Sequence, residues 1–293
     1  MENYVVGIGE ALWDMLPAGK QLGGAPANFA YHVKQLGLSS KVVSAVGNDV
    51  LGDEIMHVFR SREIPALVAR VDYPTGTVQV TLDEAGVPSY EIKTDVAWDY
   101  IPYTAELEAL ARCTKVVCFG SLAQRNAISR STIYRFLDAM PQGDDSMKVF
   151  DINLRQLFYS REIIHESLSM ANVLKINDEE LAKVGALFGL EGETVEEQCR
   201  ELLASYELKM VILTCGEQGS YVVTPTQTSY RDTPKVEVAD TVGAGDAFAA
   251  AFIAGLLKGK CLAEAHQLAV NVSAYVCTKP GAMPETSYIK ALE

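Results

Sequence analysis

DTVGAGDAFAAAFI, residues 240–253, is the stretch of sequence that decides the fold and the chemistry of this chain. Gly243 and Gly245 flank Ala244 and let the backbone approach a ligand closely, and the alanine-rich run after them favours a buried helix. A glycine turn that opens a helix leaves free N–H groups at the positive end of the helix dipole, where a phosphate binds. Asp246 would place a carboxylate beside that phosphate, which suggests a general base. The alternative is a tight turn whose aspartate only caps the helix.

Composition narrows the class of protein. The chain has 293 residues, 48% of them apolar, which suits one large domain with an appendage and excludes a disordered chain. The net charge of −13 comes without a basic run, so we expect no nucleic-acid partner. No apolar run approaches the roughly 18 residues of a membrane span, and the first residues suggest a strand and not a signal peptide. Six cysteines without zinc-binding spacing indicate reduced core residues and a cytoplasmic enzyme.

Short apolar runs separated by helical segments indicate an α/β protein. The runs lie at 4–9, 41–46, 115–119, 148–151, 173–176 and 209–214, and the first is expected to continue to Asp14. This alternation is typical of a doubly wound, mostly parallel sheet, whose ligands bind beyond the carboxyl ends of the strands. Polar and apolar residues alternate instead between Leu67 and Lys93, which predicts a hairpin with a turn at 83–86.

A second glycine stretch, GGAPANFA at residues 23–30, opens another predicted helix. Pro26 suits the first turn of a helix and Gly37 suits its end. Taken alone, the stretch is compatible with a plain strand-to-helix connection.

The two stretches together resemble the signatures of the ribokinase-like (PfkB) carbohydrate kinases, namely GGxxxN near the N-terminus and DTxGAGDxF near the C-terminus. They stand more than 200 residues apart and in the order that this family has. The resemblance implies one kinase domain over residues 1–293, in which helices flank a doubly wound, mostly parallel sheet. It also implies a small β lid over the sugar, formed by about 11–20 and 67–100, through which members of the family often dimerise.

The resemblance also implies roles for individual residues. The amides of Gly243, Ala244 and Gly245 would form an anion hole, and Asp246 would be the catalytic base. The substrate-binding residues would be Asp14 at the end of the first strand, Gly23, Gly24, Asn28 and Arg155. Arg155, from a DxNxR motif, would touch phosphate or substrate, and a structural ion pair is an equal alternative.

A further group of residues is implied for ATP and metal ions. Asn177 and Glu180, an NxxE motif, would reach Mg²⁺ through water. The alternative by residue type is that Asn177 or Asp178 merely caps the helix that carries Glu180. A TxGxxG turn would line the ATP phosphates with Thr214, Gly216 and Gly219, unless that turn is only a hairpin. Asn271 would lie beside the adenine. Family members often bind K⁺, which here would involve Asp240, Val242 and Gly281.

The expected activity is ATP-dependent phosphorylation of a primary hydroxyl of a small sugar. Pro74-Thr75-Gly76-Thr77 is similar to the PTGxA of fructokinases and favours fructose. Ribokinase, nucleoside kinase and 2-keto-3-deoxygluconate kinase remain alternatives within the family. A sugar-binding regulator without activity is the alternative from another class. Ala97-Trp98-Asp99-Tyr100 matches no motif that would identify a sugar.

Overall fold

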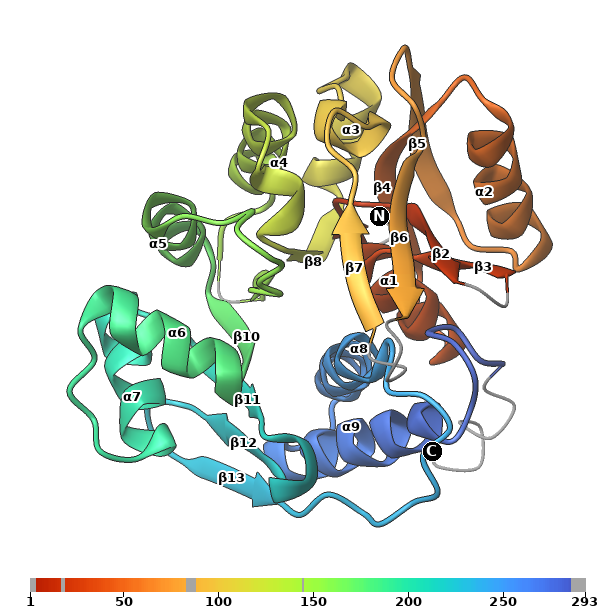
Figure 1. Ribbon diagram of the computed structural model, residues 1–293. Helices are drawn as coiled ribbons and strands as arrows, with labels where there is room; N and C mark the ends of the chain where they lie inside the picture. The colour runs from red at the N-terminus through yellow and green to blue at the C-terminus, as the bar shows by residue number, and fades with distance from the viewer. Residues whose placement is uncertain (1–3, 17–18, 83–87, 144, 286–293) are drawn as a thin grey trace.

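A nine-stranded sheet forms the centre of the molecule. The computed structural model describes residues 4–16, 19–82, 88–143 and 145–285. The strand order is β13-β12-β11-β10-β9-β8-β1-β4-β5, and all pairs from β11 to β5 are parallel, whereas β12 and β13 are antiparallel additions (Figure 1). The strands are β1 (Tyr4–Ile8), β4 (Ser40–Gly47), β5 (Ala66–Val71), β8 (Thr114–Phe119), β9 (Met147–Asp151), β10 (Val173–Asn177), β11 (Met210–Thr214), β12 (Ser220–Val223) and β13 (Thr228–Arg231).

Helices cover both faces of this sheet, which confirms the predicted doubly wound class. Two large apolar clusters lie on opposite sides of the strands, because successive strand residues point to opposite faces. One face carries α1 (Ala25–Gln35), α2 (Val50–Ser61), α8 (Ala244–Leu257) and α9 (Leu262–Cys277). The other carries α3 (Ala105–Arg112), α4 (Ala127–Ala139), α5 (Arg161–Met170), α6 (Asp178–Phe188) and α7 (Val195–Ser205).

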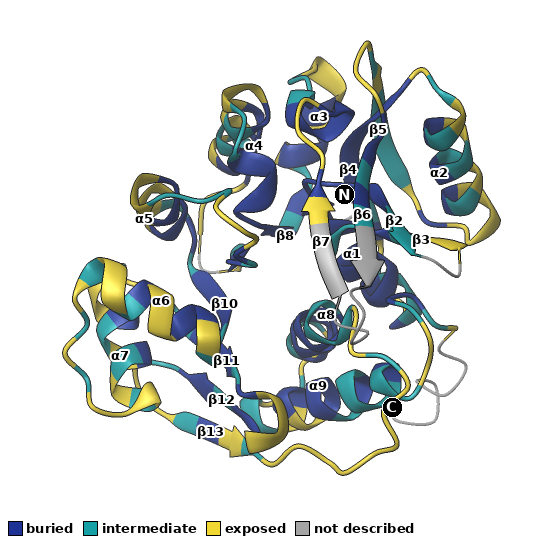
Figure 2. Ribbon diagram, viewed as in Figure 1, coloured by how far each residue is buried: buried dark blue, intermediate teal, exposed yellow. Residues whose placement is uncertain are grey.

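Helix α8 is largely buried, as the dark ribbon in Figure 2 shows. Its residues 247–255 are all buried. Small side chains let α9 come close, since a Cβ on Gly255 would lie 3.0 Å from the Cα of Ala265. The alanine-rich run therefore forms the buried helix that the sequence predicts.

A second sheet of four strands lies apart from the large one. Its order is β3-β2-β6-β7, with β2 (Leu12–Leu16), β3 (Gly19–Gly23), β6 (Gly76–Leu82) and β7 (Pro88–Ile92). The antiparallel pair β6–β7 confirms the predicted hairpin, and the expected turn at 83–86 lies outside the described residues.

Two details differ from the sequence-based expectation. The first strand ends at Ile8, because the backbone turns at Gly9 (φ 149°) and leaves the large sheet, so Asp14 lies within β2 of the small sheet and does not end β1. The range expected for the lid also includes β5, whereas β5 pairs in parallel with β4 as an edge of the large sheet. Alternating polarity alone does not distinguish an edge strand from a separate hairpin.

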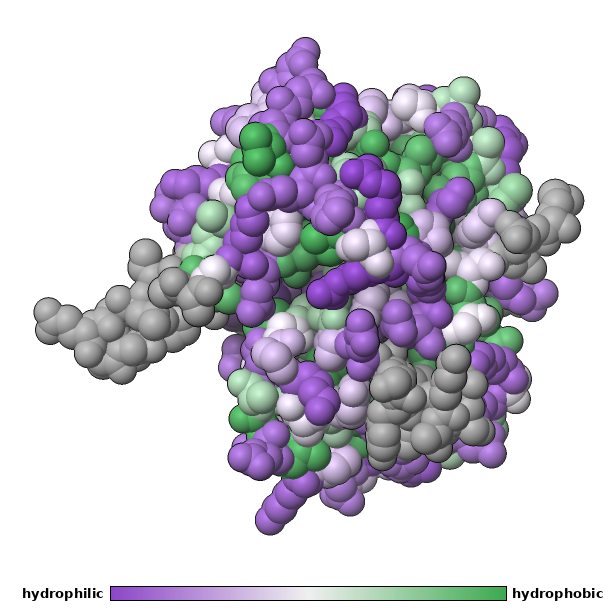
Figure 3. Space-filling model, turned by 90° about the vertical axis from the view of Figure 1, so that its right-hand side faces the viewer, coloured by the Kyte–Doolittle hydropathy of each residue, from purple (hydrophilic) through white to green (hydrophobic). Residues whose placement is uncertain are grey.

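The surface is largely polar where Figure 3 shows it, with hydrophobic residues scattered between hydrophilic ones. Among the residues whose placement is described, no helix is long and apolar enough to cross a membrane.

Candidate active site

The N-terminus of α8 offers unpaired donors. Its N-cap is Gly243, in the left-handed region at φ 76°, and no side chain caps the helix. The amides of Gly243, Gly245 and Asp246 have no hydrogen-bond acceptor among the described residues, whereas Ala244 N–H donates to Thr241 C=O at 3.2 Å. The predicted anion hole therefore has free amides on both sides of Ala244, and the Ala244 amide itself is turned toward the chain.

The glycine turn is packed against the loop that follows α9, which includes Gly281 and Ala282 and is called the closing loop below. A Cβ on Gly243 would lie 2.6 Å from the Cβ of Ala282, so only glycine fits there. Asp240 joins the two segments, because its carboxylate accepts the N–H of Val242 and the N–H of Gly281, each at 3.0 Å. The structure thus brings together the three residues expected at a potassium site.

Asp246 is buried in the first turn of α8. Burial raises the pKa of its carboxyl, against the opposing effects of the Lys175 charge and a hydrogen bond from Asn28. That bond runs from Asn28 Nδ2 to Asp246 Oδ2 at 2.7 Å. Asn28 Oδ1 is buried without a partner among the described residues, so it can accept a hydrogen bond from a hydroxyl group. Asn28, predicted as a sugar ligand, is therefore also a partner of the predicted base.

Two charged residues beside Asp246 were not assigned a role from the sequence. Lys175 Nζ lies 3.1 Å from Asp151 Oδ1, and both side chains are buried. Burial lowers the pKa of Lys175, but the charges of Asp151, Glu180 and Asp246 outweigh this effect and hold it above its ordinary value. A Cβ on Gly245 would lie 2.9 Å from Lys175 Nζ, so the glycine leaves room for an ammonium group at the anion hole. A lysine inside an otherwise apolar strand was the signal that marked this residue.

Glu10 is a third residue that the sequence reasoning passed over. It follows β1, is only 2% exposed, and its Oε2 has no partner among the described residues. Burial raises its pKa to about 7, and the charge of Asp246 adds to this effect. An acid directly after the first buried strand was the available signal.

Asp14 and Arg155 lie at the border of this buried group. Burial raises the pKa of Asp14 to about 6, whereas the charge of Arg155 acts to lower it. Gly23 lies opposite Leu12 in the β2–β3 pair, and a side chain on Gly23 would collide with the Asp14 carboxylate. Gly24 packs in the same way against the carbonyl of Glu10. Arg155 is exposed and makes no ion pair within the described residues.

The NxxE residues form a capping box at the start of α6. Asn177 Oδ1 accepts the N–H of Glu180 at 2.8 Å, and Glu180 Oε2 accepts the N–H of Asn177 at 3.0 Å. Glu180 Oε1 accepts the N–H of Leu154 at 2.9 Å. Each carboxylate oxygen still has a lone pair for a water molecule. The pair therefore suits an Mg²⁺ ion held through water and not one bound directly.

The residues expected to bind ATP are only partly gathered. Thr214 ends β11 beside Asn177, its partner in register. Gly216 is exposed in η3 (Gly216–Gln218), and Gly219 begins the turn into β12, with the carbonyl of Arg231 2.5 Å from where its Cβ would lie. Asn271 lies on α9, where its Oδ1 accepts a hydrogen bond from Gln267 at 3.0 Å. The TxGxxG turn is thus also a hairpin connection, as the alternative interpretation held.

No cluster of three or more His, Cys, Asp or Glu side chains that could hold a metal ion occurs among the described residues. The polar groups of this site are mainly backbone amides, two cations and paired carboxylates. Such a set fits a phosphate group whose metal ion keeps most of its own water.

Comparisons with known proteins agree with this geometry. The model of the pfkB family of carbohydrate kinases matches residues 18–287. An ATP-dependent 6-phosphofructokinase of Thermoanaerobacterium thermosaccharolyticum is 32% identical and aligns over 98% of this chain and 93% of its own length. A fructokinase of Klebsiella pneumoniae is 29% identical, over 98% and 97%.

Solved structures of similar fold include a double-mutant fructokinase of Vibrio cholerae with fructose, ADP and a potassium ion bound. It superimposes with a TM-score of 0.82 at 25% identity, over 100% of this chain and 98% of that one. The signatures at residues 23–30 and 240–253, the doubly wound sheet and the match over nearly the whole chain lead to one conclusion: this chain belongs to the pfkB family of carbohydrate kinases.

Proposed function

We propose that this kinase transfers the γ-phosphoryl group of ATP to a primary hydroxyl of a small sugar, converting D-fructose to fructose 6-phosphate. The observation that carries the proposal is the uncapped N-terminus of α8 with buried Asp246 in its first turn. Free amides there suit the charge of a phosphoryl group, and the carboxylate suits the proton of the attacking hydroxyl.

The proposed reaction follows from these positions. The sugar oxygen attacks the γ-phosphorus, the bond from this phosphorus to the bridging oxygen of ADP breaks, and the hydroxyl proton passes to Asp246. Asn28 Nδ2 orients the carboxylate through the 2.7 Å hydrogen bond. The amides of Gly243 and Gly245 and the Lys175 ammonium stabilise the charge on the transferred group. A magnesium ion held through water by Asn177 and Glu180 would supply further positive charge to the phosphates.

The assignment of fructose rests on three observations. Asp14 and the free Oδ1 of Asn28 are acceptors that suit sugar hydroxyls. The stretch 74–77 enters the small sheet with the sequence PTGT, which is similar to fructokinases. A fructokinase is also among the relatives that align over nearly the full chain.

A second candidate is the phosphorylation of fructose 6-phosphate at its other primary hydroxyl. The 32% identical relative is a 6-phosphofructokinase. Arg155, exposed and without an ion pair among the described residues, is the cation near Asp14 that remains available for a substrate phosphate. Arg125 and Lys175, by contrast, are paired with buried aspartates.

The two candidates are separated by an ADP-release assay with fructose, fructose 6-phosphate, ribose, nucleosides and 2-keto-3-deoxygluconate. We expect the highest kcat/KM for fructose, with Arg155→Met changing it less than about tenfold. A preference for fructose 6-phosphate that Arg155→Met abolishes would establish the second candidate. Binding of a sugar without turnover of any would support a regulator.

Dependence on a monovalent cation is a subsidiary proposal. Asp240, Val242 and Gly281 come together at the closing loop, and the Vibrio fructokinase structure holds potassium. We expect higher rates in K⁺ than in a bulky organic cation of equal ionic strength. Equal rates would remove the cation from the proposal.

A dimer formed through the small sheet is a separate proposal, and light scattering would test whether the chain dimerises.

A further inference from the structure

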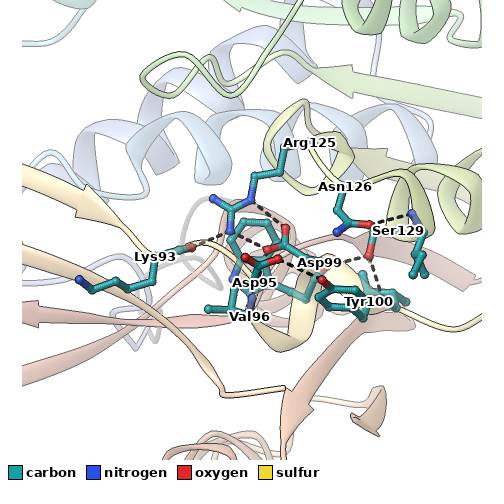
Figure 4. Close-up of polar contacts among 11 residues, drawn as sticks. Lys93, Asp95, Val96, Asp99, Tyr100, Arg125, Asn126 and Ser129 are labelled. Atoms are coloured by element: carbon teal, nitrogen blue, oxygen red, sulfur yellow. Dashed lines mark hydrogen bonds and ion pairs between the residues drawn. The ribbon is translucent and has the colours of Figure 1, made fainter. Parts of the chain in front are cut away.

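The segment η1 (Ala97–Tyr100), which matched no family motif, is held by one buried arginine (Figure 4). Arg125 follows η2 (Leu122–Gln124) and donates two hydrogen bonds to the Asp99 carboxylate. They run from Nε to Oδ1 and from Nη2 to Oδ2, each at 2.8 Å. The side chains are 7% and 2% exposed. Nη2 also donates to the carbonyl of Lys93, at the exit of β7, at 2.6 Å.

The guanidinium group of Arg125 also lies over two aromatic rings. It lies 4.0 Å from the ring centre of Trp98 and 4.6 Å from that of Phe158. Its remaining nitrogen, Nη1, is buried without a hydrogen-bond partner among the described residues. A buried unpaired donor costs stability, so this arrangement is not the one that stability alone would select.

Segment η1 is also fastened to α4. Ser129 Oγ donates to the carbonyl of Trp98 at 2.8 Å and accepts the N–H of Ile101 at 2.9 Å. The end of the small sheet is therefore attached to the rigid body of the large one at two points, Ser129 and Arg125.

The elements that meet at Arg125 also border the proposed sugar position. Strand β7, whose exit Arg125 holds, pairs with β6, and β6 pairs with β2 so that Val78 lies opposite Asp14. Phe158 belongs to the loop that carries Arg155, three residues earlier. The arginine thus links the sheet that carries Asp14 to the loop that carries Arg155.

We propose that Arg125 is a positioning residue for the kinase reaction, which fixes the small sheet over the sugar and so sets sugar affinity without contacting the sugar. The inference rests on the proposed placing of the sugar against Asp14. Lysine would keep the charge but lose the two-pronged contact, because an ammonium group cannot present two parallel donors to one carboxylate.

The decisive variant replaces both partners, as Arg125→Met with Asp99→Leu. Removing one partner leaves a buried unpaired charge, whereas replacing a buried ion pair by apolar residues is often neutral for stability. Methionine also keeps contact with both aromatic rings. We expect a folded protein by circular dichroism whose KM for fructose rises about tenfold or more, whereas its KM for ATP changes less than about twofold.

Arg200→Met is the matched control. Arg200 of α7 also joins two segments, because it contacts Glu196 in its own helix and Thr228 of β13, which is an edge strand of the large sheet. We expect this variant to leave both KM values unchanged. A folded double variant with the wild-type KM for fructose would reduce the Arg125 cluster to a structural ion pair.

Amide hydrogen exchange, measured without substrate, tests the inference even if fructose is not turned over. The double variant should exchange faster than wild type in β7 and η1 (88–100), while α7 exchanges as before. Inactivity of the wild type on fructose would count against the proposed function only. Unchanged exchange in 88–100 would overturn the positioning role whatever the substrate.

Discussion

Helices α6 and α8 both begin beside the end of β10, but the amides at their N-termini differ in whether side chains cap them. At α6, the side chains of Asn177 and Glu180 satisfy each other's amides in a capping box. At α8, Gly243 supplies no side chain, and amides remain unpaired among the described residues. Both helices have the same dipole, so the difference lies in the availability of donors. The capped helix gains stability, whereas the uncapped one keeps its donors for a ligand.

The largest effect is expected from Asp246, the first-turn acid of the uncapped helix. Asp246→Asn should lower kcat by ~10²–10⁴ with nearly unchanged sugar binding, because a positioned base acts in the transition state. Steady-state kinetics with the preferred sugar measures this change. The matched control is Glu179→Gln, an exposed first-turn acid of α6, for which we expect a wild-type kcat. A change confined to KM would falsify the role of Asp246 as base.

Asp14 sharpens the comparison, because it lies in β2, where we propose that the sugar binds, and on neither helix. Asp14→Asn should raise the sugar KM by the ~1.5–3 kcal/mol of a charged hydrogen bond, with a smaller change in kcat. Since the pKa of Asp14 is raised to about 6, sugar affinity of the wild type should weaken as pH falls through about 6 and the carboxylate takes up a proton. The variant should lose this pH dependence; if it retains the full dependence, another group is responsible.

Gly243 and Gly189 form a matched pair from the two helices, with φ angles of 76° and 71°. Gly189→Ala, at the end of α6, meets no atom within 4 Å, so it should cost only the ~1 kcal/mol of a left-handed alanine. Gly243→Ala adds a collision with Ala282, so we expect a loss of about 2 kcal/mol or more together with reduced kcat. Denaturant unfolding and kinetics measure both. Equal stability losses with full activity would show that the glycine turn tolerates a side chain.

The smallest effect is expected at the capped helix. Glu180→Gln should cost about 1 kcal/mol of stability and raise the Mg²⁺ concentration for half-maximal rate about tenfold, as for residues that hold a metal through water. Glu197→Gln in the capping box of α7 is its control, because Glu197 and Thr194 make the same pair of hydrogen bonds at an exposed helix end. Glu197→Gln should cost stability without changing the Mg²⁺ titration. Identical titrations for wild type and Glu180→Gln would make the NxxE pair a cap only.

Local patterns were sufficient for most elements. Asp49 caps α2 by accepting the N–H of Gly52 at 2.7 Å, as its residue type favours. Gly37 follows the end of α1 in the left-handed region, where the sequence predicted the end of a helix. The path of the chain after Ile8 was not predictable in this way. Leu12 to Leu16 is apolar enough for either sheet, and the turn at Gly9 decides which one it joins.

The candidate site likewise has one part that local sequence predicts and one part that it does not. The glycine stretches and Asp246 are contiguous in sequence, so their local geometry follows from backbone freedom and helix propensity. The partners of Asp246 come from distant strands and helices. Its contact with Asn28 spans 218 positions in sequence, and the Lys175 charge reaches it from β10.

The sequence by itself determined the doubly wound class, the helix with an uncapped glycine turn and the kinase family. These depend on short-range periodicity, backbone conformation and contiguous motifs. Only the tertiary structure decided that Lys175 and Asp151 lie buried near Asp246, that Asp14 belongs to the small sheet, and that Arg125 binds Asp99. The physical reason is that burial, charge pairing and the space around a glycine depend on residues far apart in the chain, which no local pattern specifies.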